Sequence, residues 1–180
     1  TEGTCTVDAA AQLAGKPSMM NAELLTDKRK SIPEKVSTEL TKMINTYTQL
    51  QESLANDNLS HSQNHFEKIQ QLSNLNLNSN LNKKANKEIE KSIRMINRIT
   101  SEETELTLEK IRKKNIALSQ EFIHLIESYS FMDSKLYINY CPMAKNNQGA
   151  FWLTDSSGIR NPYFGASMLK CGETRETINY

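Results

Sequence analysis

The stretch that decides the fold is residues 31–55, SIPEKVSTELTKMINTYTQLQESLA. Ser31 and Glu34 enclose a proline in the pattern of a capping box, which predicts that a helix begins here. Apolar side chains then recur at alternating steps of four and three residues, the spacing of one helix face. The segment therefore predicts an amphipathic helix of about 22 residues. Its buried stripe is Val36, Leu40, Met43, Tyr47, Leu50 and Leu54.

Three further segments repeat this periodicity and are separated by short polar loops. Each places large apolar side chains on one face of a predicted helix. Short loops make consecutive long helices antiparallel neighbours, so we expect a mainly α fold, an up-and-down antiparallel four-helix bundle. The expected helices span 58–75, 81–99 and 103–129, with inward-facing Leu59, Phe66, Ile69 and Leu72; Ala85, Ile89, Ile93 and Ile96; and Leu108, Ile111, Leu118, Phe122, Leu125 and Tyr129.

Local signals mark the ends of these helices. Asp57 or Asn58 can cap the second helix, and Thr100 to Glu103 form a second capping-box pattern before the fourth. The asparagine-rich run at 73–82 alternates like a strand. Because asparagine is a poor strand former and a good turn former, we expect a loop there, with frayed helix ends.

The chain divides into two parts on this pattern. Residues 1–30 show no sustained periodicity and are expected to be an N-terminal arm or linker, whereas 31–180 form the helical bundle domain. The domain ends in an irregular tail at 132–180 that is rich in cysteine, methionine and aromatic residues. Short strands are expected at 136–140 and 150–153. We expect the tail to fold back over one end of the bundle.

Composition narrows the possible functions. A net charge of +1 gives no electrostatic case for nucleic-acid binding, and no apolar run approaches the roughly 20 residues of a transmembrane helix. A catalytic cysteine needs a base. No histidine lies near Cys141 or Cys171 in sequence, although His124 could approach in space, and there is no C-x-x-C motif. We therefore expect no enzyme activity.

The tail carries two pairs of sulfur side chains. Cys141 and Met143 stand two residues apart, so they point to the same side if the segment is extended. Met168 and Cys171 stand three apart, on one face of a helical turn. The two pairs can converge on one ion, and thiolate and thioether ligands select Cu(I) or the similar Ag(I). Zinc would more usually take four Cys or His ligands.

Two alternatives stay open for these residues. Cys141 and Cys171 can form a disulfide that closes a loop of about 30 residues, worth roughly 3–4 kcal/mol on the chain-entropy model. The two methionines can instead fill the core against Trp152 and Phe164, because sulfur–aromatic contacts are common there. The first reading makes the tail a lock for a structural or protein-interaction domain.

Other side chains carry weaker signals. A second sulfur group, Cys5 with Met19 and Met20, either binds metal or leaves a spare or intermolecular thiol. His61 and His65 lie one helical turn apart and could bind a metal, but we expect them to be solvent-exposed. The remaining expectations concern the tail. They are an aromatic pocket of Trp152, Tyr163 and Phe164, an Arg160 that bonds a carboxylate or tail carbonyls, and a positive φ at Gly165.

The tail motifs carry a family resemblance. C-P-M-A, N-x-G-A-x-W-L, R-N-P-Y-F-G and M-L-x-C-G occur in order between 141 and 172. With them the chain resembles, over roughly 40–180, the helical C-terminal domain of periplasmic adaptor subunits in copper/silver efflux systems of the resistance-nodulation-division type. That domain is catalogued as a domain of unknown function and also occurs as a free-standing exported protein.

The resemblance implies a function and a setting. It implies an exported or periplasmic protein that handles Cu(I) or Ag(I), with components of an efflux system as partners. The ligands it implies are Cys141, Met143, Met168 and Cys171. No adaptor core is visible in the sequence. We therefore expect a soft-metal binding module that buffers the ion or hands it over, the alternative being the disulfide-locked domain.

Overall fold

Four long helices pack on one another in sequence order in the computed structural model, which describes residues 29–74, 83–101 and 105–179. Their positions agree with the predicted helices to within a few residues. Most of the predicted arm at 1–30, and most of the predicted loop at 73–82, lie outside the described residues. The helices are α2 (Glu34–Ala55), α3 (Leu59–Ser73), α4 (Lys83–Thr100) and α5 (Leu108–Ser128).

The predicted apolar stripes form most of the core. All six stripe residues of α2 are at most 1% exposed, and Phe66 and Ile69 of α3 are fully buried. The α4 stripe is buried at its three isoleucines; its fourth expected member, Ala85, has no described side chain. Leu59 was predicted to face inward, which is wrong: it is 39% exposed, because it opens α3 at the turn after α2.

The predicted start of the first helix needs a correction. Ser31 does not cap α2, because Lys30–Ser31 form the short strand β1, which pairs in parallel with β2 (Tyr129–Ser130). The N-cap of α2 is Pro33, which makes no side-chain capping bond. Extended pairing with the end of α5 thus replaces the local capping box.

Of the other two capping predictions, one is confirmed and one is wrong. Asn58 caps α3 as predicted, its side-chain oxygen accepting a bond from the His61 N–H at 3.0 Å. Thr100 instead ends α4 and donates to the Ile96 carbonyl at 2.9 Å, so the capping box predicted there is wrong. The cap of α5 is Thr107, which accepts from the Lys110 N–H at 3.3 Å.

The C-terminal part is more regular than predicted. Both predicted strands are present, but they belong to a three-stranded antiparallel sheet in the order β4-β3-β5. The third strand was missed because five of its six residues are exposed, so it has no alternating apolar signal. The elements are β3 (Leu136–Cys141), the short α6 (Ala144–Asn147), β4 (Ala150–Thr154), the 3-10 turn η2 (Gly165–Met168) and β5 (Glu173–Ile178).

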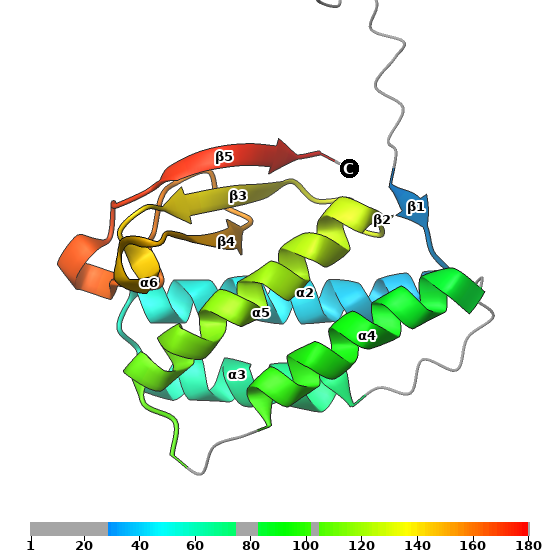
Figure 1. The fold of residues 1–180 in the computed structure, drawn as a ribbon, viewed down its shortest axis with the longest axis horizontal. Coiled ribbons are helices and arrows are strands. Elements are labelled where there is room, and N and C mark those ends of the chain that lie inside the picture. Colours follow the sequence, from blue (N-terminus) through cyan, green and yellow to red (C-terminus); the bar gives the residue numbers. More distant parts are fainter. Residues whose placement is uncertain (1–28, 75–82, 102–104, 180) are drawn as a thin grey trace, which may run out of the picture.

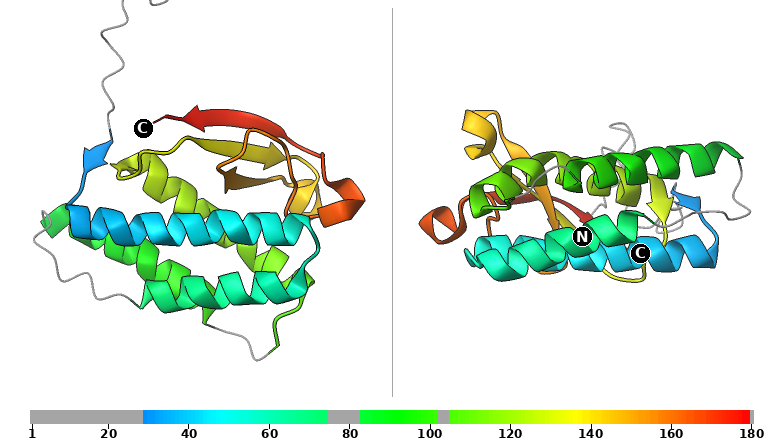
Figure 2. Two further views of the ribbon diagram at one scale, coloured as in Figure 1. Left: turned by 180° about the vertical axis from the view of Figure 1, so that it is seen from behind. Right: turned by 90° about the horizontal axis from the view of Figure 1, so that it is seen from below.

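The sheet shares its core with the helices instead of capping one end of them. It lies against α2 and α5, on the side turned away from α3 (Figures 1 and 2). The first and last helices contact each other little, and β4 packs on both. The main apolar cluster accordingly includes Leu136, Ile138, Leu153 and Ile178 beside the helical stripes.

No helix in the described ranges is long and apolar enough to cross a bilayer.

Candidate functional site

The two tail cysteines lie in contact. The Sγ atoms of Cys141 and Cys171 are 3.4 Å apart although 30 residues separate them in sequence, and both thiols are free. Cys141 ends β3 and is fully buried, whereas Cys171 is half-buried. Two of the four predicted sulfur ligands are therefore brought together, one sealed in the core and one reaching toward the surface.

Strand pairing sets this meeting. Tyr140 of β3 pairs with Glu173 of β5. Cys141, which follows Tyr140, and Gly172, which precedes Glu173, therefore lie at the same end of the sheet. Gly172 has a φ of +135°, and a Cβ there would lie 2.8 Å from both the Tyr140 carbonyl oxygen and Trp152 Cη2. Only glycine lets the chain pass this close beside the tryptophan and deliver Cys171 to Cys141.

Residues 161–171, which we call the cysteine loop, are closed by Asn161. Its backbone N–H donates to the Leu169 carbonyl at 2.8 Å, and its side-chain amide donates to the Cys171 carbonyl at 2.7 Å. Its side-chain oxygen accepts from the Tyr163 N–H at 2.8 Å, and the residue is fully buried. Asn161 therefore fixes the backbone that carries the second thiol.

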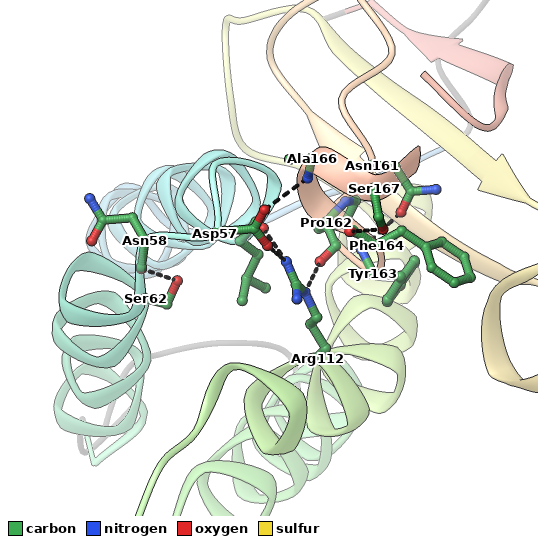
Figure 3. Close-up of polar contacts among 11 residues, drawn as sticks. Asp57, Asn58, Ser62, Arg112, Asn161, Pro162, Tyr163, Phe164, Ala166 and Ser167 are labelled. Atoms are coloured by element: carbon green, nitrogen blue, oxygen red, sulfur yellow. Dashed lines mark hydrogen bonds and ion pairs between the residues drawn. The ribbon is translucent and has the colours of Figure 1, made fainter. Parts of the chain in front are cut away.

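The cysteine loop is attached to the helices by the Asp57–Arg112 clamp (Figure 3). Arg112 of α5 forms an ion pair with Asp57 and donates to the carbonyls of Pro162 at 2.9 Å and Leu54 at 2.7 Å. Asp57 accepts from the Ala166 N–H at 2.9 Å. These bonds, the one from Arg112 first, hold the pKa of Asp57 below its usual value. One arginine thus joins α2, α5 and the loop.

Two predictions about the loop region are confirmed. Gly165 has a φ of +56°, and a Cβ there would fall on the Asp57 carboxylate and 2.5 Å from Arg112 Nη2. Arg160 bonds a carboxylate, its Nε donating to Glu52 at 2.8 Å. Arg160 thus binds the loop region to α2, and Gly165 lets the loop approach the Asp57 carboxylate closely.

The methionines lie differently from the thiols. Cys141 is the last strand residue, and Met143 lies in the following turn, so the extended geometry assumed for this pair is wrong. Met143 is 44% exposed, which removes it from the core. Met168 ends η2 and is half-buried, and the Cys171 N–H donates to its carbonyl at 3.0 Å. This is the helical turn expected for the second pair.

The aromatic residues gather around the thiols. Trp152 is fully buried in the apolar cluster that contains Cys141, and Tyr163 and Phe164 pack against this cluster. The Tyr163 ring meets the indole edge-on at 5.9 Å between centroids. Trp152 is thus the anchor of the tail's core, and its indole N–H is buried without a partner among the described residues.

The thiol contact has an electrostatic consequence. The hydrogen bond with Cys141, followed by burial, raises the pKa of Cys171. The Cys171 thiol therefore holds its proton more tightly than a solvated cysteine does. A thiophilic cation could replace that proton and offset the mutual repulsion of two thiolates.

The remaining predicted ligands do not join this site. Cys5, Met19 and Met20 lie outside the described residues. His124 is exposed on α5, and His61 and His65 lie on α3. Among the described residues, no group of three or more histidine, cysteine, aspartate or glutamate side chains is placed to hold a metal.

No protein-family model, curated protein or solved structure matches this chain.

Proposed function

We propose that this chain is a soft-metal binding module that holds Cu(I) or Ag(I) between Cys141 and Cys171. The observation that supports the proposal is the 3.4 Å separation of the two thiol sulfurs. Two thiolates are a donor set that prefers soft monovalent ions over hard ones. Because the sulfurs already lie in contact, no backbone segment has to move to bring them together.

The burial of the two thiols supports a transfer role. Cys141 sits in the dry cluster with Trp152, which protects a bound ion from water, and Cys171 is half-buried, which leaves a side from which a partner's ligand can attack. Met168, one turn before Cys171, supplies a thioether as a third ligand. Met143, on the exposed turn, supplies a weaker ligand for entry or exit. Exchange of ligands then hands the ion on.

The setting of this activity comes from the tail motifs. Their resemblance to the helical domain of copper/silver efflux adaptors supports an exported or periplasmic location and efflux components as partners. It also supports a helical bundle with a cysteine- and methionine-rich tail as the fold. These parts of the proposal depend on the motifs alone.

Anaerobic titration with Cu(I) against a competing chelator tests the site. We expect one ion per chain. Cys141→Ser and Cys171→Ser should each abolish tight binding, Met168→Leu should weaken it, and Cys5→Ser should leave it unchanged as the matched thiol control. Equal affinity in the parent chain and in both tail cysteine variants would rule out the site.

The second candidate is a disulfide-locked structural or protein-interaction domain. The same thiol contact favours it, because oxidation would close the 30-residue span between the two cysteines. Mass measurement after thiol alkylation under non-reducing conditions separates the two. A chain that keeps two protected cysteines, and that takes up no copper when reduced anaerobically, supports the lock and contradicts the metal module.

A further inference from the structure

A second cluster of metal-binding side chains lies on α3, outside the cysteine site. His61 and His65 are one helical turn apart, with their ring centroids separated by 6.4 Å. His61 is exposed, and His65 is half-buried instead of exposed as the sequence suggested. The rings meet edge-on, at 66° between their planes, so their nitrogens can be turned toward a common point by rotation of the side chains.

Both imidazoles open into one pocket. It has a volume of about 250 Å³ and is shared with α2, which contributes Gln49, Glu52 and Asn56. These groups bring carboxylate and amide oxygens to the wall that faces the histidines. The volume is large enough for an ion with several water ligands. The pocket therefore joins two nitrogen donors to an oxygen-rich surface.

We propose that His61 and His65 bind a borderline divalent transition-metal ion, such as Ni²⁺, Cu²⁺ or Zn²⁺, in this pocket. Imidazole nitrogen suits these ions, and two histidines at positions i and i+4 of a helix are a recurrent metal-chelating pair. Water molecules complete the coordination sphere. With two protein nitrogens the site is open and exchangeable, in contrast to a closed structural zinc site.

The surroundings of His65 prepare it for this role. Burial, followed by the charges of His61 and Lys68, lowers its pKa. A lowered pKa favours the neutral form of the ring, which is the form that binds a metal ion. Glu52, on the wall of the pocket, is paired with Arg160 at 2.8 Å and accepts from Asn56 at 2.8 Å.

One existing contact must change on binding. The Asn58 side-chain amide lies 3.3 Å from His61 Nδ1 and donates to it when this nitrogen carries no proton. A metal ion takes either this nitrogen, replacing Asn58, or Nε2, with the ring changing tautomer. Both routes exchange one hydrogen bond and leave the cap from Asn58 to the His61 N–H in place.

Paramagnetic NMR with Ni²⁺ on the full chain tests the inference. Ni²⁺ is used because thiols do not reduce it. We expect the ring signals of His61 and His65 to broaden together at low metal ratios, while those of His124, the exposed histidine of α5, stay sharp. Equal broadening of the three histidines, or broadening of none, would overturn the proposal.

Affinity measurements on variants give an independent readout. Since loss of an outer-sphere partner alone costs about 10- to 100-fold, His61→Gln and His65→Gln should each weaken Ni²⁺ binding by at least about 10-fold. His124→Gln should leave it unchanged. Affinity in either pocket variant equal to that of the parent would contradict the site. Because Cys141 and Cys171 remain in all three variants, failure here does not bear on the soft-metal proposal.

Discussion

The carboxylate of Asp57 accepts a hydrogen bond from the backbone N–H of Ala166 at 2.9 Å, across 109 residues of sequence. This bond connects the turn between α2 and α3 to the loop that carries Cys171. The same carboxylate pairs with Arg112, which holds the Pro162 carbonyl of that loop. The position of the second thiol therefore depends on helix residues that contact neither sulfur.

Substitution of Asp57 should loosen the cysteine loop. Asp57→Asn keeps a residue type that tolerates the φ of +55° found there, but removes the charge opposite the mostly buried Arg112. We expect the free energy of unfolding to fall by about 1–2 kcal/mol, measured by urea denaturation. Glu90→Gln, in the exposed pair with Arg94, is the matched control and should cost at most about 0.5 kcal/mol. Equal losses would contradict the clamp.

Acid should remove the difference between Asp57→Asn and the parent chain. The pKa of Asp57 is lowered in the fold from 3.8, so its contribution is complete above that pH and disappears as the pH falls through the lowered value. The two chains should therefore differ in stability at neutral pH and converge in strong acid. A difference that stays constant at all pH values would assign the loss to packing instead of charge.

Two glycines of the tail make a matched pair. Gly165→Ala places a Cβ on the Asp57 carboxylate at a φ of +56°, whereas a Cβ at Gly158 meets nothing closer than 4.0 Å. Left-handed strain costs about 1–3 kcal/mol and the clash adds to it. We expect a clearly lower melting temperature for Gly165→Ala only, together with faster alkylation of Cys171. Similar melting temperatures for the two variants would show that the loop is not held at Gly165.

The sequence predicted the helices well because each has a long stripe at helical spacing. It failed where long-range partners replaced local signals. Ser31 has the pattern of a cap, yet strand pairing with Ser130 takes its place. The sequence pattern also missed β5, because backbone hydrogen bonds set its register with β3 and its residues show no apolar alternation.

The candidate site was only partly predicted, because residue spacing carries no information about long-range contacts. Spacing identified Cys141 and Cys171 as tail residues of interest, and the structure places them in contact. Spacing could not place Met143, since the turn after β3 breaks the extended geometry. Nor could it find Asp57 or Arg112, because an ion pair between two distant helix ends leaves no periodic signal.

A buried amide pair should show strong coupling. Gln51 of α2 and Asn115 of α5 exchange two side-chain hydrogen bonds, at 2.8 and 3.0 Å, and both are at most 1% exposed. Asn115→Leu leaves the buried side-chain oxygen of Gln51 without its donor, and its NH2 group with the 3.4 Å bond to the Tyr47 carbonyl, at a cost of about 1–3 kcal/mol. The double change to leucine should cost less than the sum of the single changes in a denaturation cycle. Additive losses would mean that the two amides act independently.

High pH should destabilise the chain through Tyr47. Its hydroxyl lies 2.6 Å from Ser119 Oγ in the core, and burial raises its pKa well above 10.0. The unfolded tyrosine ionises first, so the stability is complete below pH 10 and decreases above it. Tyr47→Phe should reduce that alkaline slope in denaturation curves, whereas Tyr137→Phe on β3 should keep it. An unchanged slope in the first variant would refute the assignment.

Cu(I) affinity should rise with pH if the thiol pair is the site. Binding must displace protons from the sulfurs, and the contact with Cys141 raises the pKa of Cys171, so protons still compete at neutral pH. Each proton released strengthens binding by up to about tenfold per pH unit while the thiol is protonated. We expect this rise in anaerobic competition titrations at several pH values, and a smaller one in Cys171→Ser. Affinity that is independent of pH in the parent chain would place the ion on thioethers, which carry no proton, and not on the two cysteines.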